Sequence, residues 1–477
     1  MLSVLLGVNK NVTFFDNLEQ FSSKTAVISE RAERISYQHL LSISDDIGRR
    51  VESRALIFLI CKNSLESIAG YIGFVRSKSV VALLDSKISN EALFNLIGTF
   101  KPRYIYTPVE KSKLNINTNV VFTNQDYVLL ETSYQIAHNP HGDLVLLLST
   151  SGSTGSPRFV RQSYKNIESN TEAIAEYLQI DNSDCPITTL SMSYTYGLSI
   201  INSHLSRGAS VILTESTLME RRFWQLLQQE KATTFGGVPY TYEMLKKLGF
   251  GRMDLPSLKS LTQAGGKLSE ELLVEFIDTC KRKGIKFYVM YGQTEASPRM
   301  SYLPWGCAQS KIGSIGIAIP GGHFCLEDEQ GNLIEASDTS GELVYKGDNV
   351  ALGYAESCRD LGKGDENKGV LHTGDIAKRD ADGFYYIVGR KKRFLKMFGN
   401  RVNLDEVERL IRKVGVDCVC SGSDDDLKIY TTCARDQKLV EDYLMEQTSI
   451  LRRGITFVLI EEIPRSESGK ILYSLLS

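Results

Sequence analysis

The sequence predicts an α/β protein with a large, multi-layered N-terminal domain and a small C-terminal α+β domain. First, the chain has 477 residues, and a single hydrophobic core stops growing near ~250 to 300 residues, so at least two domains are expected. Second, apolar runs of buried-strand type alternate with segments of helical spacing before residue 140. Third, several strand-like runs end abruptly in small polar residues, and loops at strand ends hold the chemistry of α/β proteins.

The expected elements follow from local apolar patterns. An apolar run predicts a buried strand at 55–61, and helical spacing predicts a helix at 64–76. The strand-like run at 143–148 stops at a stretch of Ser, Thr and Gly. Further helices are expected at 164–178, 220–231 and 269–283. Strands that end in loops are expected in LTQAGGK and IKFYVMYGQTE.

After Gly341 the sequence changes to short β-type segments separated by turns. The basic stretch 390–401 (RKKRFLKMFGNR) follows, and a helix is expected at 403–413 because its apolar positions fall on one face. We place a domain boundary near Lys392. It divides the chain into a large domain, 1–391, and a small mobile domain, 392–477.

Composition excludes several classes of protein. Lys and Arg number 55 and Asp and Glu 57, so the net charge of −2 supplies no global field toward nucleic acid or an anionic membrane. Nine scattered cysteines without a CxxC pair argue against a disulfide framework or a structural zinc site, and favour the reducing cytosol. No apolar run approaches the ~20 residues that span a bilayer, and the N-terminus is expected to be mature protein.

Residues 150–158 read TSGSTGSPR and predict an anion-binding loop. Its glycines allow positive φ and close approach of a ligand, so backbone N–H groups and hydroxyls can surround a triphosphate. A Walker A loop would need Lys followed by Ser or Thr after the second glycine, and this loop lacks them. Taken alone, the segment is better interpreted as a flexible turn. The candidate phosphate ligands are Thr150, Ser151, Gly152, Ser153, Thr154 and Gly155.

The loop is the first of seven ordered segments that resemble the motifs of the AMP-forming, adenylate-producing enzymes. That superfamily includes acyl-CoA synthetases, acyl-carrier-protein ligases, luciferases and peptide-synthetase adenylation domains. The segments are STSGSTGSPR, QAGGKLS, YGQTEAS, GSIGIAIPG, GELVYKGDNVALGY, HTGDIAKRDADGFYYIVGRKKR and PRSESGKIL. The resemblance covers most of the chain from Asp143 onward. It implies the adenylate-forming fold and an enzyme that uses ATP and Mg²⁺.

The resemblance implies a nucleotide and metal site. Glu295 matches the Mg²⁺ carboxylate, and a dication that bridges phosphate oxygens favours one or two carboxylates plus waters. Thr154 would help to hold the metal. Tyr291 would lie against the adenine, although core packing alone could also explain it, and Gly265 and Gly266 would let the backbone reach the base edge. Further nucleotide contacts are expected at Gly292, Gln293 and Thr294.

Two more residues match the ribose and reaction sites of that superfamily. Asp375 would accept both ribose hydroxyls, since a carboxylate can take two O–H donors, and Arg390 would add a second contact. Lys470 resembles the lysine that bridges the substrate carboxylate and the α-phosphate. A carboxylate is already ionised and nucleophilic at neutral pH, so the obstacle is repulsion between two anions, which a cation relieves.

The basic stretch would also serve the second half-reaction. By itself it suggests a nucleic-acid patch, but few aromatic residues are interleaved in it. In the superfamily the position of Lys392 is a hinge. Rotation of the small domain about it would bring Gly399 and Arg401 to a thiol channel.

The sequence departs from the family pattern in two places. Arg158 stands where lysine is usual; it keeps the charge but changes the geometry. The pocket segment around Tyr194, Tyr196 and Gly197 lacks the Asp that amino-acid-activating members use to hold the α-ammonium, so an acid without an α-amino group is favoured. The stretch FGNRVNLDEVE nevertheless resembles the amino-acid-activating branches. Gly237 and Val238 complete the expected pocket.

The resemblance therefore predicts an ATP-dependent acid–thiol ligase. It would convert a carboxylic acid and ATP into an acyl-adenylate and pyrophosphate, and then pass the acyl group to the phosphopantetheine thiol of CoA or of an acyl carrier protein. An amino-acid adenylating ligase for a stand-alone carrier protein is the first alternative. A catalytically weakened nucleotide-binding scaffold is the second.

Overall fold

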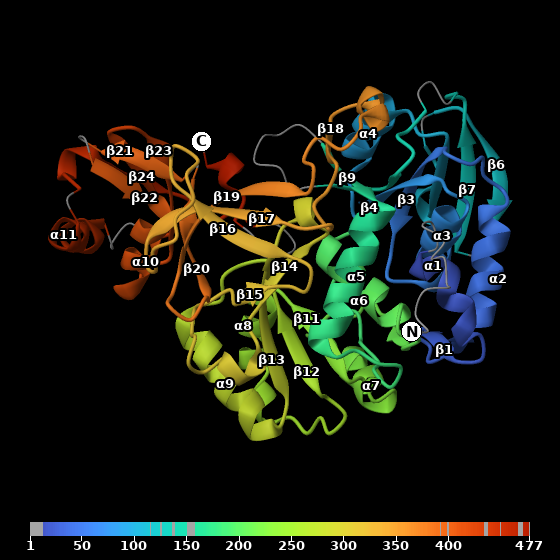
Figure 1. Ribbon diagram of the computed structural model, residues 1–477, viewed down its shortest axis with the longest axis horizontal. Helices are drawn as coiled ribbons and strands as arrows, with labels where there is room; N and C mark the ends of the chain where they lie inside the picture. The colour runs from blue at the N-terminus through green and yellow to red at the C-terminus, as the bar shows by residue number, and fades with distance from the viewer. Residues whose placement is uncertain are drawn as a thin grey trace, which may run out of the picture.

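The computed structural model describes the chain from residue 13 to residue 476, apart from several short gaps. The described ranges are 13–114, 116–124, 126–135, 139–149, 158–391, 393–397, 400–433, 437–448, 450–465 and 471–476. For residues 394, 396, 400, 401 and 474 only the backbone is described. Figure 1 shows a large body of stacked sheets and helices, with the C-terminal elements in a smaller lobe at the left.

The first large sheet has eight strands and helices on both faces. Its order is β18 (Gly353–Ala355), β9 (Phe159–Ser163), β8 (Leu144–Ser149), β4 (Val80–Asp85), β3 (Leu56–Cys61), β5 (Tyr104–Pro108), β7 (Tyr127–Thr132) and β6 (Thr118–Thr123). Strands β8, β4, β3 and β5 are parallel, and the outer strands are antiparallel.

The residues of the central strand β3 are all apolar because both of its faces are buried. Ile57 and Leu59 pack into a core shared with helices α2 (Tyr37–Gly48) and α3 (Leu65–Arg76). Phe58 and Ile60 point the other way, into a core shared with α4 (Asn90–Phe100). Since successive side chains of a strand alternate between faces, a strand covered on both sides reads as a continuous apolar run. The predicted strand at 55–61 is confirmed.

The second large sheet has five strands in the order β11 (Thr234–Gly237), β12 (Ser260–Gln263), β13 (Lys286–Gly292), β14 (Arg299–Tyr302) and β15 (Ile317–Ala318). Phe287 and Val289 of β13 face a core shared with α7 (Arg221–Gln229), α8 (Pro239–Lys247) and α9 (Glu270–Lys283). Tyr288 and Met290 face α5 (Tyr164–Leu178) and α6 (Thr195–Leu205).

Helices α5 and α6 contribute to the cores of both large sheets, and Figure 1 shows them between the two. The predicted helix at 164–178 is confirmed as α5, which Ser163 caps by accepting from the backbone N–H of Asn166. Helix α6 was not predicted. Its sequence, TYGLSIINSHL, shows no single apolar stripe because the helix is buried between layers on almost every side, its Ser, Asn and His residues included.

Two smaller sheets complete the large domain. One has three strands, β10 (Val211–Ile212), β1 (Thr25–Ile28) and β2 (Arg34–Ser36), and the short helix α1 (Phe14–Asn17) precedes it. The other is antiparallel and has four strands, β16 (His323–Glu327), β17 (Ser340–Lys346), β19 (Val370–Arg379) and β20 (Tyr385–Arg390). Strands β17, β19 and β20 correspond to the β-type segments that the sequence predicted after Gly341.

The C-terminal lobe has a hydrophobic core of its own, formed by residues such as Leu404, Ile411 and Leu427. Its elements are β21 (Phe394–Met397), β22 (Asn400–Asn403), α10 (Leu404–Lys413), β23 (Cys418–Ser423), β24 (Asp426–Thr431), α11 (Gln437–Gln447) and β25 (Ile455–Leu459). Helix α10 corresponds to the helix predicted at 403–413. The boundary near Lys392 stays a prediction; the elements that follow β20 form this separate core.

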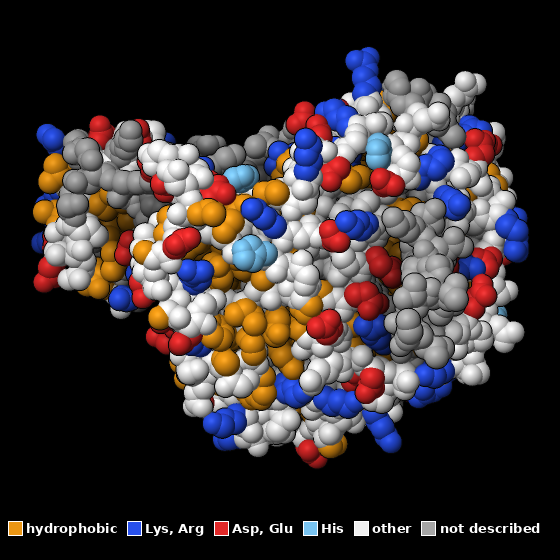
Figure 2. Space-filling model, in the orientation of Figure 1, with side chains coloured by type: hydrophobic (Ala, Val, Ile, Leu, Met, Phe, Trp, Pro, Cys, Tyr) orange, Lys and Arg blue, Asp and Glu red, His pale blue; other side chains and the backbone are white. Residues whose placement is uncertain are grey.

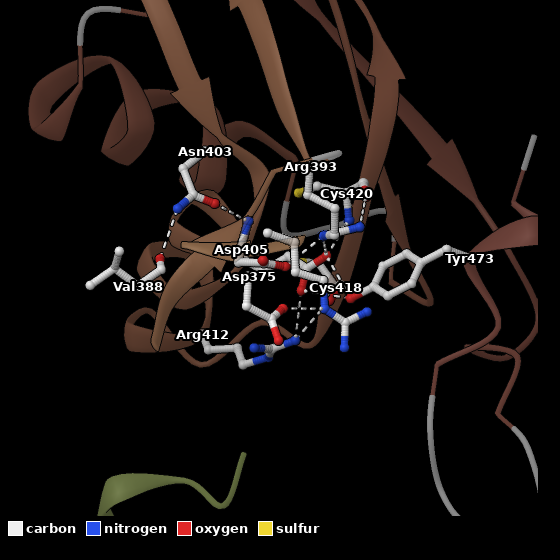
Figure 3. A network of polar contacts seen from close by, with 11 residues as sticks. Asp375, Val388, Arg393, Asn403, Asp405, Arg412, Cys418, Cys420 and Tyr473 are labelled. Atoms are coloured by element: carbon white, nitrogen blue, oxygen red, sulfur yellow. Dashed lines mark hydrogen bonds and ion pairs between the residues drawn. The ribbon is translucent and has the colours of Figure 1, made fainter. Parts of the chain in front are cut away.

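A buried ion network ties this lobe together next to the boundary (Figure 3). Arg393 donates to Asp405 and Glu408 at 2.5 Å each, and its guanidinium carbon lies 3.8 Å from the centroid of the Tyr473 ring. Glu408 is 3% exposed and also accepts from the backbone N–H of Cys420 at 2.8 Å. The chain just after the boundary is thereby fixed to the chain near the C-terminus.

Charges of both signs share the surface, and the cysteines form no disulfide bonds. On the face shown in Figure 2, Lys and Arg are interspersed with Asp and Glu. All nine cysteines are free thiols. Across the described ranges, no helix is long and apolar enough to cross a membrane.

The buried His204, at the end of α6, is expected to make the folded protein less stable in acid. Burial lowers its pKa to about 4, below the ~6.5 expected in the unfolded chain. Below pH 6.5 the unfolded chain therefore gains a proton that the folded protein does not bind, so the stabilisation present at neutral pH is lost as the pH falls toward 4, by about 3 kcal/mol. We expect His204→Asn to reduce this loss. Urea unfolding at pH 7 and pH 5 measures it, and an equal pH dependence in both proteins would contradict the assignment.

Candidate active site

The candidate site begins at the edge of the five-stranded sheet where three parallel strands end. Strands β11, β12 and β13 run in register, so the loops that follow them lie side by side. Gly265, after β12, has a φ of +82°. A Cβ added there would lie 2.8 Å from the hydroxyl of Tyr194 and 3.0 Å from Val238. Only glycine fits this position, where the chain passes close to the wall of the predicted pocket.

Asp375 lies at the centre of a polar cluster. It is 6% exposed and accepts from the hydroxyl of Tyr291 at 2.5 Å and from Nε2 of Gln293 at 3.1 Å. Arg390, paired with it across β19 and β20, places its Nε 3.4 Å from Asp375 Oδ1. Burial raises the pKa of Asp375, while Tyr291 and Arg390 oppose the shift. The structure thus brings together four residues that the sequence picked from two separate motifs.

Glu295 lies in the turn after β13 and is held from β18. Its Oε1 accepts from the hydroxyl of Tyr354 at 2.7 Å. The guanidinium carbon of Arg158 lies 4.1 Å from the centroid of the same Tyr354 ring. Burial raises the pKa of Tyr354, and Glu295 adds to the shift. One tyrosine therefore positions both the predicted metal carboxylate and the arginine that replaces the usual lysine.

The predicted acid pocket is lined by the start of α6 and the end of β11. Tyr194 precedes α6, and Tyr196 is 2% exposed with its hydroxyl 2.7 Å from the carbonyl oxygen of Thr262. Their rings lie 6.3 Å apart in an edge arrangement. The other predicted pocket positions lie in or beside these two elements: Gly197, Gly237 and Val238. Three predicted nucleotide contacts lie at the ends of the neighbouring strands β12 and β13: Gly266, Gly292 and Thr294.

A carboxylate from another element lies against this pocket segment. Asp85, at the end of β4, accepts from the hydroxyl of Ser193 at 3.1 Å. Asp85 also accepts from the backbone N–H of Lys87 at 2.9 Å. Asp85 lies 108 residues before Ser193 in the sequence, so the pocket segment alone did not predict this carboxylate.

Several predicted residues lie outside the described part of the chain. They are Thr150, Ser151, Gly152, Ser153, Thr154 and Gly155 of the phosphate loop, the hinge Lys392, Gly399, and Lys470. The side chain of Arg401 is likewise not described. Near Lys470, the flanking residues Arg465 and Ile471 pair as an antiparallel bridge.

Sequence reasoning also missed four contributors that only the fold assembles. Tyr354 stands in a motif that was quoted but was not singled out. Gln162 of β9 donates from Nε2 to the carbonyl oxygen of Thr294 at 2.9 Å. Asp85 and Arg299, which lies behind the pocket, complete the set. Apart from the motif that contains Tyr354, none of the four carries a local signal of function, because each acts on residues that lie far away in the sequence.

A comparison with protein families identifies the kind of enzyme. The model of the family described as "AMP-binding enzyme" matches residues 14–355, well over half of the chain. The chain belongs to the AMP-binding enzyme family. The resemblance inferred from the seven motifs is therefore confirmed.

Relatives of this AMP-binding enzyme include ligases. A probable 4-coumarate–CoA ligase 1 of Dictyostelium discoideum is 30% identical over 467 residues, which cover 87% of this chain and 84% of the relative. A 2-succinylbenzoate–CoA ligase of Bacillus cereus strain AH820 is 24% identical and covers 91% of this chain and 89% of the relative.

Solved structures confirm the fold of the AMP-binding enzyme. MenE of Bacillus subtilis in complex with an acyl-adenylate intermediate has a TM-score of 0.79 at 21% identity, with 97% of each chain covered. ATP-bound MatB of Rhodopseudomonas palustris has a TM-score of 0.77 at 19% identity, with 97% of this chain and 98% of that chain covered. The predicted architecture, with a large N-terminal and a smaller C-terminal domain, is confirmed.

These findings confirm the predicted class of activity: the protein is an ATP-dependent, AMP-forming acid–thiol ligase that uses Mg²⁺. The residues present fit this use. Within the described ranges, no cluster of three or more His, Cys, Asp or Glu could hold a metal by itself. A single carboxylate such as Glu295, completed by phosphate oxygens and waters, is an ordinary Mg²⁺ arrangement.

Proposed function

We propose that this enzyme activates a small carboxylic acid without an α-amino group as its acyl-adenylate and transfers the acyl group to the thiol of CoA. The observation that carries the proposal is the buried carboxylate of Asp375, held by Tyr291 and Gln293 beside Arg390. CoA is favoured over a carrier protein because the relatives named above are CoA ligases. An acyl carrier protein stays the alternative acceptor.

In this proposal each predicted residue has a part. Asp375 accepts the ribose hydroxyls, Tyr291 lies against the adenine, and Glu295 with Thr154 holds Mg²⁺ against phosphate oxygens supplied by ATP. The small domain, 392–477, then turns about Lys392 for thiol attack. Residues that would bind the triphosphate lie in the loop 150–155, with Arg158 following it.

The predicted pocket favours an uncharged or acidic substrate over an amino acid. Tyr194 and Tyr196 present aromatic walls, and the buried cation of Arg299 lies 4.3 Å from the Tyr196 ring. A substrate ammonium in this pocket would be repelled by that cation. We place the reaction in the cytosol, where ATP and CoA are available and free thiols persist.

Asp85 favours a second candidate, an amino-acid adenylating ligase. Its carboxylate lies beside Ser193 in the pocket segment, where it could pair with an ammonium. ATP–pyrophosphate exchange with short, aromatic, hydroxylated, dicarboxylic and amino acids separates the two. Exchange with amino acids alone would overturn the first proposal. For an acid that supports exchange, thioester formation with CoA or with a phosphopantetheinylated carrier protein then identifies the acceptor.

Replacement of Asp375 tests the ribose contact. Asp375→Asn keeps the shape but removes the charge that strengthens hydrogen bonds to hydroxyl donors, so we expect the Kd for ATP to rise about 10- to 100-fold. Because burial raises the pKa of Asp375, the affinity of the wild-type enzyme for ATP should begin to fall at a higher pH than it would with an Asp of ordinary pKa. Calorimetric titration measures both effects. Asp338→Asn, an exposed carboxylate near the same sheet, should leave the Kd unchanged.

A further inference from the structure

The guanidinium of Arg393 is fixed along its edge by three acceptors. Nε donates to Asp405 and Nη2 to Glu408, each at 2.5 Å, and Nη1 donates to the backbone carbonyl oxygen of Cys420 at 3.1 Å. Glu408 is held in turn by the backbone N–H of Cys420 and by Arg412, 3.3 Å away. Because a planar guanidinium with all three nitrogens engaged loses these hydrogen bonds if it rotates, its two faces keep one orientation.

Tyr473 lies on one face of this guanidinium (Figure 3). The centroid of its ring is 3.8 Å from the guanidinium carbon, well inside the ~6 Å range of a cation–π contact. The hydroxyl donates to Oε2 of Glu408 at 3.4 Å. Burial raises the pKa of this hydroxyl, and Glu408 raises it further, so the hydroxyl stays a donor at neutral pH. The ring and the hydroxyl therefore both attach Tyr473 to the buried ion network.

The chain around Tyr473 is otherwise held by short, local contacts. The backbone N–H of Leu472 donates to the carbonyl oxygen of Pro464 at 2.9 Å, next to the bridge between Arg465 and Ile471. Ile471 and Tyr473 also pack on a small apolar cluster, whose buried members are Val419, Tyr430 and Leu476. Since the last residues of a domain are poorly ordered unless they are tied down, the contact with Arg393 is a substantial part of this anchor.

The other partner of the contact, Arg393, is the first residue after the predicted hinge at Lys392. Its backbone N–H donates to the carbonyl oxygen of Arg390 at 2.9 Å, and its own carbonyl oxygen accepts from the N–H of Leu404 at 2.9 Å. Arg393 thereby joins the end of β20 to the start of α10. Its position in the small lobe is thus set by backbone and side chain together.

The predicted reaction lysine, Lys470, is close to this anchor in the sequence. Lys470 itself lies outside the described ranges, but it directly precedes Ile471 and stands three residues before Tyr473. The contact between Arg393 and Tyr473 therefore connects the chain that follows the hinge with the chain that follows the lysine.

We propose that Arg393 and Tyr473 are positioning residues for Lys470. Their contact makes the C-terminal segment turn together with the chain after the hinge, so that the lysine reaches the substrate carboxylate and the α-phosphate in one orientation. A cation that is already held in place stabilises developing charge better than one that must be ordered during the reaction. This inference rests on the proposed function and names the residues that bring its lysine into place.

The two half-reactions of the full-length enzyme test the proposal. ATP–pyrophosphate exchange with an acid that wild type accepts measures the first, and thioester formation from the synthetic acyl-adenylate of that acid measures the second. Tyr473→Leu removes the ring over the guanidinium but keeps an apolar side chain. We expect it to lower kcat for exchange about 10- to 100-fold, while the KM for ATP and the rate of thioester formation change little.

Two conservative variants examine the contact itself. Tyr473→Phe keeps the ring over Arg393 and should recover most of the rate of exchange. Arg393→Lys keeps a positive charge beside Asp405 and Glu408 but removes the flat face on which the ring lies, so it should behave like Tyr473→Leu. Tyr443→Leu, which removes a tyrosine from α11 of the same lobe, is the matched control and should leave both half-reactions unchanged.

Combination with Lys470→Ala separates positioning from stability. If Tyr473 acts through the lysine, Tyr473→Leu should cost nothing further in the Lys470→Ala enzyme, because the group that it positions is gone. A purely structural role would instead lower the melting temperature, slow both half-reactions, and reduce exchange by the same factor with and without Lys470.

The outcomes distinguish this inference from the proposed function. Equal exchange by wild type and Tyr473→Leu, or an equal loss in both backgrounds, overturns the inference and leaves the proposed function. Undiminished exchange by the Lys470→Ala enzyme also overturns the inference, because that result leaves no lysine to position. Failure of every acid to support exchange in wild type overturns both.

Discussion

Replacement of Lys470 by alanine is expected to reduce acyl-adenylate formation by about 100- to 1,000-fold. The lysine would neutralise the repulsion between the substrate carboxylate and the α-phosphate, and removal of one charge-stabilising group costs about that much in rate. Thioester formation from supplied acyl-adenylate should change far less, because that step no longer joins two anions. ATP–pyrophosphate exchange measures the first half-reaction, and CoA thioester formation from synthetic acyl-adenylate measures the second. Lys413→Ala, on the exposed end of α10, should alter neither.

The complementary result is expected at the hinge. Lys392→Pro restricts the backbone about which the small domain would turn, so it should spare adenylate formation and impair thioester formation. Lys392→Ala removes the same side chain without restricting the backbone and should impair neither step strongly. If the Lys470 and Lys392→Pro variants harmed both half-reactions equally, alternation between two domain positions would be wrong for this enzyme.

The second large effect is expected at Glu295. Glu295→Gln removes the only charge that the turn after β13 offers to Mg²⁺, while the amide can still accept from Tyr354. We expect kcat/KM for adenylate formation to fall about 100- to 1,000-fold, since metal stabilisation of phosphoryl charge contributes several kcal/mol. Raising the Mg²⁺ concentration should restore part of the loss. Exchange assays across a Mg²⁺ series measure this.

Two comparisons delimit the role of Glu295. Tyr354→Phe removes only the hydroxyl that holds the carboxylate, so a smaller loss, about 10-fold or less, is expected. Glu172→Gln, an exposed carboxylate paired with Arg207, should have no effect. A Glu295→Gln enzyme with an unchanged Mg²⁺ dependence would show that the metal is held elsewhere.

The sequence by itself determined the family and the layered α/β fold, and it predicted the residues of a nucleotide site. Its motifs lie in the loops after strands, and strands with two covered faces, such as β3, are recognisable because burial requires a continuous apolar run. Helices α5 and α10 were predictable for the same kind of reason, since a cap and an apolar stripe are local features. These signals need only a few neighbouring residues.

Only the tertiary structure decided which distant residues meet. Tyr354 reaches Glu295 from β18, Asp85 reaches the pocket segment from β4, and Arg299 is buried among α5, α6 and β13. An arginine looks alike in sequence whether it lies on a surface or in a core. Whether it is buried depends on packing between segments more than 100 residues apart, such as Arg299 and Tyr177.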